Sequence, residues 1–405
     1  MNALAQQFTE LSTWLDTHRQ LWEQRPFESM PLPWEKTYPQ ISLYLENVSL
    51  ETAALLEADI LHGANAPALI HDWKNSAETL SQCLPLSQQQ TAEAPHFPLH
   101  ERWKIPLRKR RQIEAFAKIA STPVQKSGHL VDWCAGKGHL GRYLAARQET
   151  RLLCLEKSSS LCEAGTILAN RAGVDCTMKQ IDVMSDSVES LFQPTSNIVA
   201  LHACGFLNQR LLRLAVKYRS KAVSLAPCCY HKQESDAEYY APLSSIGLRV
   251  DLKLDQQALR LPTTEEVVAG KRKKKIRQQQ GLYRMALDLL LREASGIDRY
   301  RHLPAVPDGW ARISFSEFSQ RMADRFELCL PKSWDESTVL KEANARLRRS
   351  RKFGLLRRLF RRPIELWLVL DRALYLQENG YQTRMGSFCP RNVTPRNIAI
   401  IATLP

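Results

Sequence analysis

The chain has 405 residues, of which 44% are hydrophobic and 24% are charged. This composition is ordinary for a soluble protein with a sizeable core, so it excludes a disordered or collagen-like chain, and the length suits roughly two to three domains. The sequence has no apolar run of ~18 residues and no basic segment followed by an apolar one at its start, so it predicts neither a membrane span nor a secretory signal. We therefore expect a cytoplasmic protein with no membrane partner.

The formal net charge of +14 is distributed unevenly. Residues 1–100 carry a net charge of −8, residues 101–250 carry +9, residues 251–362 carry +12 and the remainder carries +1. Dense basic runs lie at residues 108–111, 271–275 and 346–362. Such runs are typical of proteins that neutralise phosphates, although any one of them also fits a solvated helical surface. Taken together, they predict RNA as a partner.

In chain order, residues 1–103 have the pattern of an acidic helical region, because Phe8, Leu11 and Leu15 recur at helical spacing. A basic amphipathic helix follows, and its apolar stripe includes Ile113 and Phe116. This helix opens a second segment, residues 104–231, in which the pattern changes.

From about residue 129, short apolar runs alternate with helical stretches. The runs predict five strands, at residues 130–134, 152–155, 177–181, 198–202 and 222–226. Alternation of this kind predicts a parallel sheet that is covered by helices on both faces. Residues 232–362 break the rhythm, and we interpret them as a basic insertion that binds substrate. Residues 363–405 then predict an apolar helix and two strands that complete the sheet, which makes the fold class α/β.

A glycine-rich turn follows the first predicted strand and precedes a predicted helix. The sequence from residue 129 to residue 141 is HLVDWCAGKGHLG. Glycines at such a turn let the chain bend sharply and let a ligand approach the backbone amides at the start of the helix. The turn also fits the GxGxxG spacing of dinucleotide sites, so the glycines alone do not identify the ligand.

Acidic residues accompany three successive strands. Asp132 lies within the first strand, Glu156 ends the second and Asp182 ends the third. We expect Glu156 to accept ribose hydroxyls and Asp182 to accept an adenine amino group, while the alternative is that each acid only caps a helix. Asp132 would repel a pyrophosphate but attract a cationic amino acid moiety. This favours S-adenosylmethionine over a dinucleotide.

Three ordered motifs carry a family resemblance: VDWCAGKGHLG at 131–141, ALHACG at 200–205 and APCCYH at 226–231. The chain resembles class I S-adenosylmethionine-dependent methyltransferases of the GKG type, including the methyltransferase domain of glutathione S-transferase C-terminal-domain-containing proteins and, more distantly, the enzymes that 2′-O-methylate the tRNA acceptor stem. The resemblance covers residues 104–231 and, more faintly, 363–405. It implies a Rossmann-like fold with S-adenosylmethionine bound by Asp132, Cys134, Ala135, Gly136, Lys137, Gly138, His139, Leu140, Glu156, Lys157, Asp182, Val183, His202 and Ala203.

The candidate catalytic residues follow the fourth and fifth strands. The fourth strand ends in Leu201-His202-Ala203-Cys204 instead of the Asn/Asp-Pro-Pro-Tyr/Phe loop of many amino-group methyltransferases. Attack by an exocyclic amine is therefore less supported. His202 is a candidate general base, and the alternative is that it hydrogen-bonds the backbone and shapes the pocket.

Cys228, Cys229 and His231 lie in the loop after the fifth strand. One thiol is a candidate nucleophile that adds to a pyrimidine. The alternative that we favour is a packed loop that lines the substrate entrance. A metal site formed by these three residues is a third interpretation, but adjacent cysteines seldom supply a tetrahedral set, so we expect no metal.

These observations predict a methyltransferase that acts on RNA, either tRNA or rRNA. A methyltransferase that acts on a ribosomal or other basic protein is the enzymatic alternative, because the acidic residues 1–100 would attract such a partner. A third possibility is a nonenzymatic RNA-binding or ribosome-assembly factor that keeps the fold as a scaffold.

Overall fold

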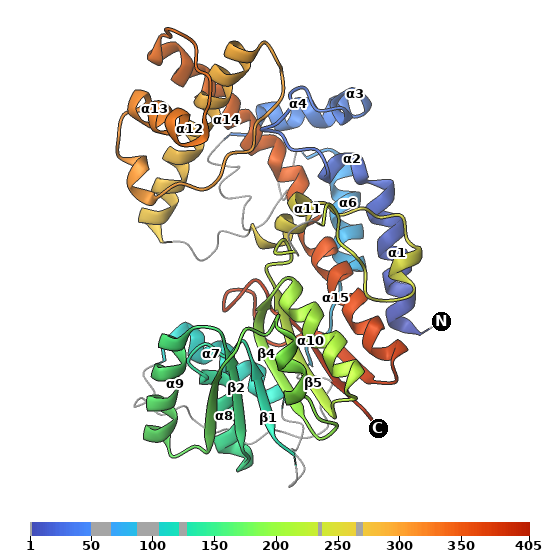
Figure 1. Cartoon of the computed structure of the whole chain (residues 1–405). Coiled ribbons are helices and arrows are strands. Elements are labelled where there is room, and N and C mark those ends of the chain that lie inside the picture. Colours follow the sequence, from blue (N-terminus) through green and yellow to red (C-terminus); the bar gives the residue numbers. More distant parts are fainter. Residues whose placement is uncertain (1, 50–65, 87–104, 121–127, 234–236, 265–269) are drawn as a thin grey trace. The chain divides into compact units, whose positions relative to one another are not determined.

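The computed structural model describes residues 2–49, 66–86, 105–120, 128–233, 237–264 and 270–405. The chain forms two compact units (Figure 1). Unit 1 comprises residues 1–16, 78–265 and 362–405, and unit 2 comprises residues 17–77 and 266–361. Each unit therefore combines segments that are distant in the sequence.

Unit 1 contains a seven-stranded sheet with the order β3-β2-β1-β4-β5-β7-β6. Its strands are β1 (Leu130–Trp133), β2 (Leu152–Glu156), β3 (Cys176–Gln180), β4 (Asn197–Cys204), β5 (Ala222–Cys228), β6 (Gln382–Ser387) and β7 (Ile398–Thr403). The first five strands are parallel, and β7 pairs antiparallel with both β5 and β6. The predicted strands, the α/β fold class and the completion of the sheet by the C-terminal strands are confirmed.

Unit 1 also contains helices, and those that contact the sheet include α8 (His139–Gln148), α9 (Ser159–Ala172) and α10 (Phe206–Lys217). The other described helices of the unit are α1 (Ala3–Thr17), α7 (Leu107–Ile119), α11 (Gln256–Arg260) and α15 (Arg361–Glu378), with short 3-10 turns η3 (Asp186–Leu191), η4 (Gly247–Arg249) and η5 (Leu261–Thr263). Every residue of β5 is buried, as expected for a central strand with both faces covered. Gly141 lets α8 pack closely on the sheet, because a Cβ at this position would lie 2.6 Å from Cδ1 of Leu152.

The last helix, α15, supplies much of the core of unit 1. Trp367 stacks on Phe8 with ring centroids 5.0 Å apart, and its indole nitrogen donates a hydrogen bond to Ser12 Oγ. Asp371 is fully buried and accepts hydrogen bonds from the Tyr240 hydroxyl and from the Ser244 amide. The helix predicted at residues 363–379 is thus confirmed, but its buried face also carries polar groups that fix the segment after β5.

Unit 2 is helical. Its elements are α2 (Arg19–Trp22), α3 (Trp34–Thr37), α4 (Pro39–Asn47), most of α6 (Ala68–Leu80), α12 (Lys271–Ser295), η6 (Asp308–Ala311), α13 (Phe315–Phe326) and α14 (Glu336–Arg358). Leu287, Phe318 and Ala343 pack in one apolar cluster that joins α12, α13 and α14. Trp34 stacks on Phe353 of α14, with ring centroids 5.6 Å apart. The early helices and the later basic segment therefore share a folding unit.

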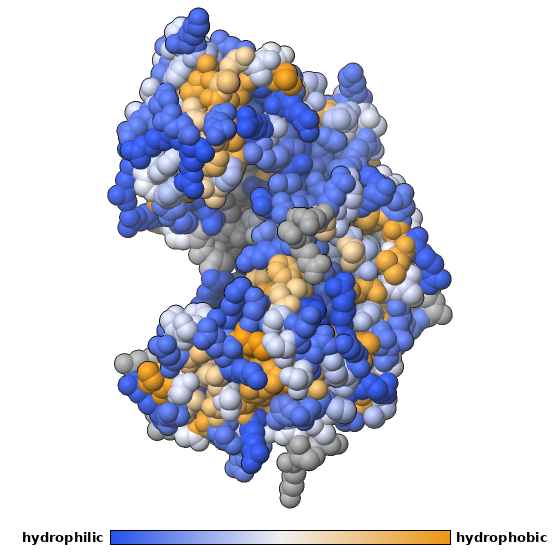
Figure 2. Space-filling model, in the orientation of Figure 1, coloured by the Kyte–Doolittle hydropathy of each residue, from blue (hydrophilic) through white to orange (hydrophobic). Residues whose placement is uncertain are grey.

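The surface is largely hydrophilic. In Figure 2, hydrophilic residues cover most of the face of unit 2 that is in view, with a smaller apolar area among them. Within the described ranges, no helix combines the length and apolar character that crossing a bilayer requires.

Candidate active site

The turn between β1 and α8 has the backbone geometry that its glycines permit. Gly136 and Gly138 have φ values of 58° and 64°, in the left-handed region that other residues adopt at a cost. A Cβ on Gly138 would lie 2.9 Å from Cys154 Sγ, whereas a Cβ on Gly136 would meet no atom within 4 Å. The turn is therefore packed on the sheet at Gly138 and open at Gly136, where a ligand has room to approach the backbone.

Glu156 joins the end of β2 to this turn. Its Oε2 accepts a hydrogen bond from the Gly136 amide at 2.9 Å, and its Oε1 accepts one from the Ser158 amide at 2.9 Å. A carboxylate has about four acceptor positions, so two remain for ligand hydroxyls. The structure thus holds the Glu156 carboxylate in one orientation beside the open turn.

Asp132 is only 3% exposed, and its Oδ2 accepts a hydrogen bond from the Gly141 amide at 2.9 Å. The helix-capping role that the sequence left open is therefore present for this residue. Burial raises the pKa of Asp132 to about 6, and the nearby ammonium of Lys109 opposes this shift. Lys109 belongs to the basic run 108–111, but here its charge lies close enough to act on Asp132.

Asp182 and Lys157 form an ion pair after β3 and β2. Lys157 Nζ lies 2.7 Å from Asp182 Oδ2, and Oδ1 of the same carboxylate accepts a hydrogen bond from the Met184 amide. The hydrogen bond from Lys157 lowers the pKa of Asp182. Val183 is buried beside it. Lys157 and Asp182 were both expected near the cofactor, and their ion pair fixes the position of each side chain.

Cys134 lies among the candidate acids. Burial, together with the charges of Glu156, Asp132 and Asp182, raises the pKa of its thiol to about 12. The Cys134 side chain is therefore a neutral thiol at pH 7. Leu140 and Ala203 are buried, Ala135 is half-buried and Lys137 is exposed.

Arg142, in the first turn of α8, contacts the glycine turn and was not singled out by the sequence pattern. It is 1% exposed, donates a hydrogen bond to the Lys137 carbonyl, and lies 2.8 Å from Nδ1 of His139. Burial and the Arg142 charge lower the pKa of His139 to about 4. Arg142 therefore stabilises the turn from within α8. The amphipathic pattern of the sequence predicted only that Arg142 lies in a helix.

His202 lies at an irregularity in the pairing of β4 with β5 and has a φ of 68°. Its Nε2 lies 3.3 Å from Oε1 of Gln112, whose Nε2 donates to the Val393 carbonyl. This arrangement assigns the proton to Nε2 of His202, because the facing amide oxygen is an acceptor. Burial lowers the pKa of His202 to about 3, with Lys109 contributing. The imidazole is therefore neutral at pH 7 and is a weak base.

The three cysteines after β4 and β5 lie together. The sulfurs of Cys204, Cys228 and Cys229 all lie within 4.8 Å of one another. Hydrogen bonding with Cys204 and Cys229 and burial raise the pKa of Cys228, whereas hydrogen bonds from Cys204 and Cys228 lower the pKa of Cys229. Between the two candidate nucleophiles, Cys229 therefore has the greater thiolate character. His231 is half-buried in the same loop.

A family model described as a methyltransferase domain matches residues 108–236, which include the turn, the acids and the cysteine loop. The chain carries a class I methyltransferase domain. S-adenosylmethionine is the methyl donor of this class. The methyltransferase domain fits such a donor, because the turn is open at Gly136 and the fixed Glu156 carboxylate retains free acceptor positions.

The chain is similar to parts of larger proteins. Glutathione S-transferase C-terminal domain-containing protein of Homo sapiens is 26% identical over 172 residues, which are 40% of this chain and 26% of that protein. The Drosophila melanogaster homolog is 29% identical over 146 residues, which are 35% of this chain and 24% of that protein. The chain thus spans about a quarter of the length of these relatives.

A solved structure of coclaurine N-methyltransferase, bound to N-methylheliamine and SAH, is also similar to the chain. The sequence identity is 14% and the TM-score is 0.24, with 53% of this chain and 62% of that chain covered.

Proposed function

We propose that this protein is an S-adenosylmethionine-dependent methyltransferase whose substrate is an RNA, either tRNA or rRNA. The methyltransferase domain supports the reaction type. The substrate class rests on one observation in unit 2, a pocket lined by basic side chains that form no ion pair within the described residues. All ten cysteines are free thiols, which suits the reducing cytoplasm that we propose as its location.

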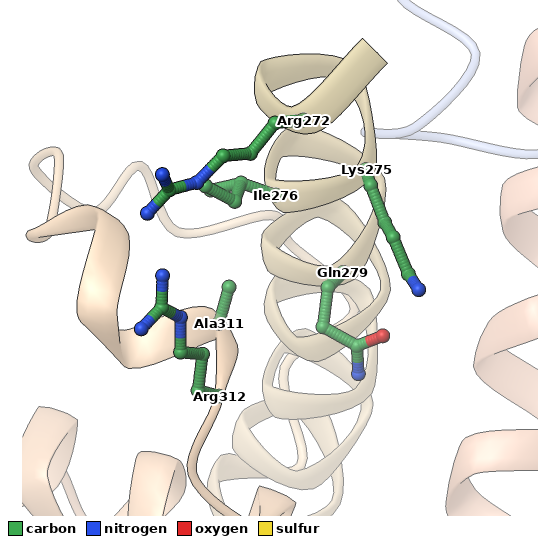
Figure 3. A pocket seen from close by; sticks show the side chains of 6 residues that line it. All are labelled: Arg272, Lys275, Ile276, Gln279, Ala311 and Arg312. Atoms are coloured by element: carbon green, nitrogen blue, oxygen red, sulfur yellow. The ribbon is translucent and has the colours of Figure 1, made fainter.

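The pocket has a volume of ≈ 290 Å³ and lies between α12 and η6. It is lined by Arg272, Lys275, Ile276, Gln279, Ala311 and Arg312. Figure 3 shows the Arg272 and Arg312 guanidinium groups extending into the space between the two elements. Within the described part of the chain, no carboxylate forms an ion pair with either arginine. Two convergent guanidinium groups are well suited to a phosphate, because each presents a planar set of donors.

The other basic runs are partly used within the protein. In the run 346–362, Arg349 pairs with Glu35 and Glu46, and Arg362 pairs with Glu365. Arg348 and Arg351 are exposed on α14. The run 271–275 begins with Lys271, whose side chain lies outside the described residues. We therefore propose that phosphates bind in unit 2 at the pocket and at the exposed arginines of α14. Only some residues of the runs 271–275 and 346–362 take part.

Within the methyltransferase domain, the proposed roles follow from the contacts. When bound, S-adenosylmethionine supplies a methyl group on a sulfonium, and an acceptor aligned with that carbon completes the transfer. We assign the ribose hydroxyls to Glu156, the adenine to Asp182 and Val183, and the cationic amino acid moiety to Asp132. His202 is neutral and fixed by Gln112, so we assign it to pocket shape and hydrogen bonding.

Methyl transfer is tested by incubating the purified protein and radiolabelled S-adenosylmethionine with RNA and protein extracts from a strain that lacks the gene. We expect the label in RNA, and digestion of that RNA to nucleosides would identify the modified position. Heat-inactivated protein serves as the control. Label that enters only protein would reject RNA as the substrate and favour the basic-protein alternative.

The pocket in unit 2 predicts a change in RNA affinity. Replacing Arg272, Lys275 and Arg312 together with alanine removes three cationic groups, so RNA binding should weaken and the slope of log affinity against log salt should become shallower by about two to three. The measurement is fluorescence anisotropy with labelled RNA at several salt concentrations. Lys273→Ala is the matched control, because Lys273 already pairs with Asp308 at 2.6 Å. An unchanged slope in the triple variant would contradict the proposal.

The raised pKa of Asp132 predicts a pH dependence of cofactor affinity. Only the ionised carboxylate attracts a cationic moiety, so the affinity for S-adenosylmethionine should fall as the pH decreases through about 6. Calorimetric titrations at several pH values between about 5 and 8 would measure the affinity for S-adenosylmethionine on both sides of this pKa. Asp132→Asn keeps an acceptor for the Gly141 amide and should bind weakly at every pH. A wild-type affinity that is independent of pH would refute the role of Asp132.

A further inference from the structure

Three thiols of unit 1 converge where β4 and β5 end. Cys204 and Cys228 are direct register partners on these neighbouring parallel strands, and their sulfurs lie 3.6 Å apart. The sulfur of Cys229 completes a set of three in which every pair lies within 4.8 Å. This cluster differs from two thiols that happen to meet in a core, because it contains three thiols that come from two strands and a loop.

The backbone around the thiols is fixed by reciprocal hydrogen bonds. The Gly205 amide donates to the Cys228 carbonyl at 2.9 Å, and the Lys232 amide donates to the Cys229 carbonyl at 2.9 Å. The Phe206 amide donates to the Lys232 carbonyl at 2.8 Å. Cys229 has a φ of 47°, a left-handed conformation that a cysteine adopts only at a cost in energy. The loop is thus held in a strained form that directs its side chain toward the other two.

His231 contributes a nitrogen to the same loop. Its Nδ1 is buried and has no hydrogen-bond partner among the described residues. The ring nitrogens of His231 do not belong to the set of ligand atoms that lie within 4.8 Å of one another. The three sulfurs are therefore the ligand atoms that the fold brings together.

The separation of the sulfurs matches a known coordination geometry. Zinc–thiolate bonds of about 2.3 Å in a tetrahedron place neighbouring sulfurs about 3.8 Å apart, close to the distance between Cys204 and Cys228. Cysteine thiolates are preferred ligands of zinc in proteins. From this geometry we infer that Cys204, Cys228 and Cys229 form a three-thiolate zinc site whose fourth position is open to water.

The site lies at the carboxyl ends of β4 and β5, beside His202. The Cys228 thiol donates a hydrogen bond to the His202 carbonyl oxygen at 3.2 Å, and because a zinc-bound thiolate has no proton to donate, zinc binding would release this contact. The sequence supplied only Cys228, Cys229 and His231 for such a site. Cys204 adds the ligand that the adjacent cysteines lacked.

The first test is metal binding by the full chain. The reduced protein is freed of metal with a chelator and titrated with Zn²⁺ in competition with a chromophoric chelator, and then with Co²⁺. We expect one equivalent per chain and the thiolate-to-cobalt charge-transfer and intense ligand-field absorption of a tetrahedral site. A reduced full chain that binds no zinc would overturn the proposal.

Variants identify the ligands. Cys204→Ser and Cys228→Ser should weaken zinc binding by about 100-fold or more, since even changes outside the ligand set cost about 10–100-fold. Cys176→Ser is the matched control, because the Cys176 thiol lies 3.9 Å from the Cys154 thiol but belongs to no cluster of three metal-ligating side chains among the described residues. Zinc binding that survives loss of the three clustered thiols would overturn the assignment.

A measurement on the unchanged protein covers the case in which a variant fails to fold. Zinc should protect Cys204, Cys228 and Cys229 from alkylation, as read by peptide mass spectrometry, while alkylation of the exposed Cys329 stays the same. Equal alkylation of the three cysteines with and without zinc would refute the site. So would a Cys204–Cys228 disulfide that persists in the zinc-treated protein under reducing conditions.

Discussion

Gly205→Ala is expected to destabilise unit 1 by about 3–5 kcal/mol. Gly205 has a φ of 50° and a ψ of −123°, and a Cβ at this position would lie 1.9 Å from the Lys232 carbonyl oxygen. A backbone conformation that only glycine adopts readily costs about 1–3 kcal/mol, and relieving the clash costs a similar amount. Urea denaturation followed by circular dichroism measures the loss in the free energy of unfolding.

Gly173→Ala is the matched control for this substitution. Gly173 has a φ of 64°, but a Cβ there would meet no atom within 4 Å, so only the backbone term of roughly 1–2 kcal/mol applies. Hydrogen exchange of the amides after β5 shows whether the Gly205 variant first releases the loop at Cys229 and Lys232. Equal destabilisation by the two alanine substitutions would contradict the close contact at Gly205.

Glu156→Ala is expected to weaken S-adenosylmethionine binding on the order of 100-fold or more. The variant loses an acceptor for the Gly136 amide and two charged hydrogen bonds to ribose hydroxyls, each of about 1.5–3 kcal/mol. Isothermal titration with S-adenosylmethionine and S-adenosylhomocysteine measures this loss, and both ligands should be affected because they share the ribose.

Two variants frame the interpretation of Glu156→Ala. Glu163→Ala removes an exposed carboxylate from the neighbouring helix α9 and should bind the cofactor normally. Glu156→Gln keeps one acceptor oxygen and should give an intermediate affinity. If Glu156→Ala binds as tightly as Glu163→Ala and has the same thermal stability as the unchanged protein, the carboxyl end of β2 does not hold the ribose.

Most of the sheet could be predicted from the sequence because β1, β2, β4, β5 and β7 are short apolar runs, whereas β3 and β6 carry more polar and exposed residues. Parallel strands that are covered on both faces are buried over their whole length, as β5 is, so their positions stand out. The acidic residues at the strand ends could be identified for the same reason, because Glu156 directly follows such a run. Because parallel strands end at the same edge of a sheet, the sequence also predicted that these acids lie at the edge formed by the carboxyl ends of the strands.

The partners of the helices could not be predicted in this way. Periodicity identifies an apolar face but not the surface that covers it, so nothing in residues 17–77 indicated that they fold with residues 266–361. Buried polar residues were missed for a related reason. Arg142 and Gln112 occupy helical positions that a pattern cannot distinguish from exposed ones, and Cys204 meets Cys228 only through strand register.

The position of β7 has a consequence for synthesis on the ribosome. β5 pairs with β7, which is made about 170 residues later, or roughly 10–35 s at typical rates of elongation. During that interval the outer edge of β5, a strand that is fully buried in the folded protein, is without its native neighbour. Nascent chains of this protein should therefore depend on chaperones that shield strand edges until residue 403 has left the exit tunnel.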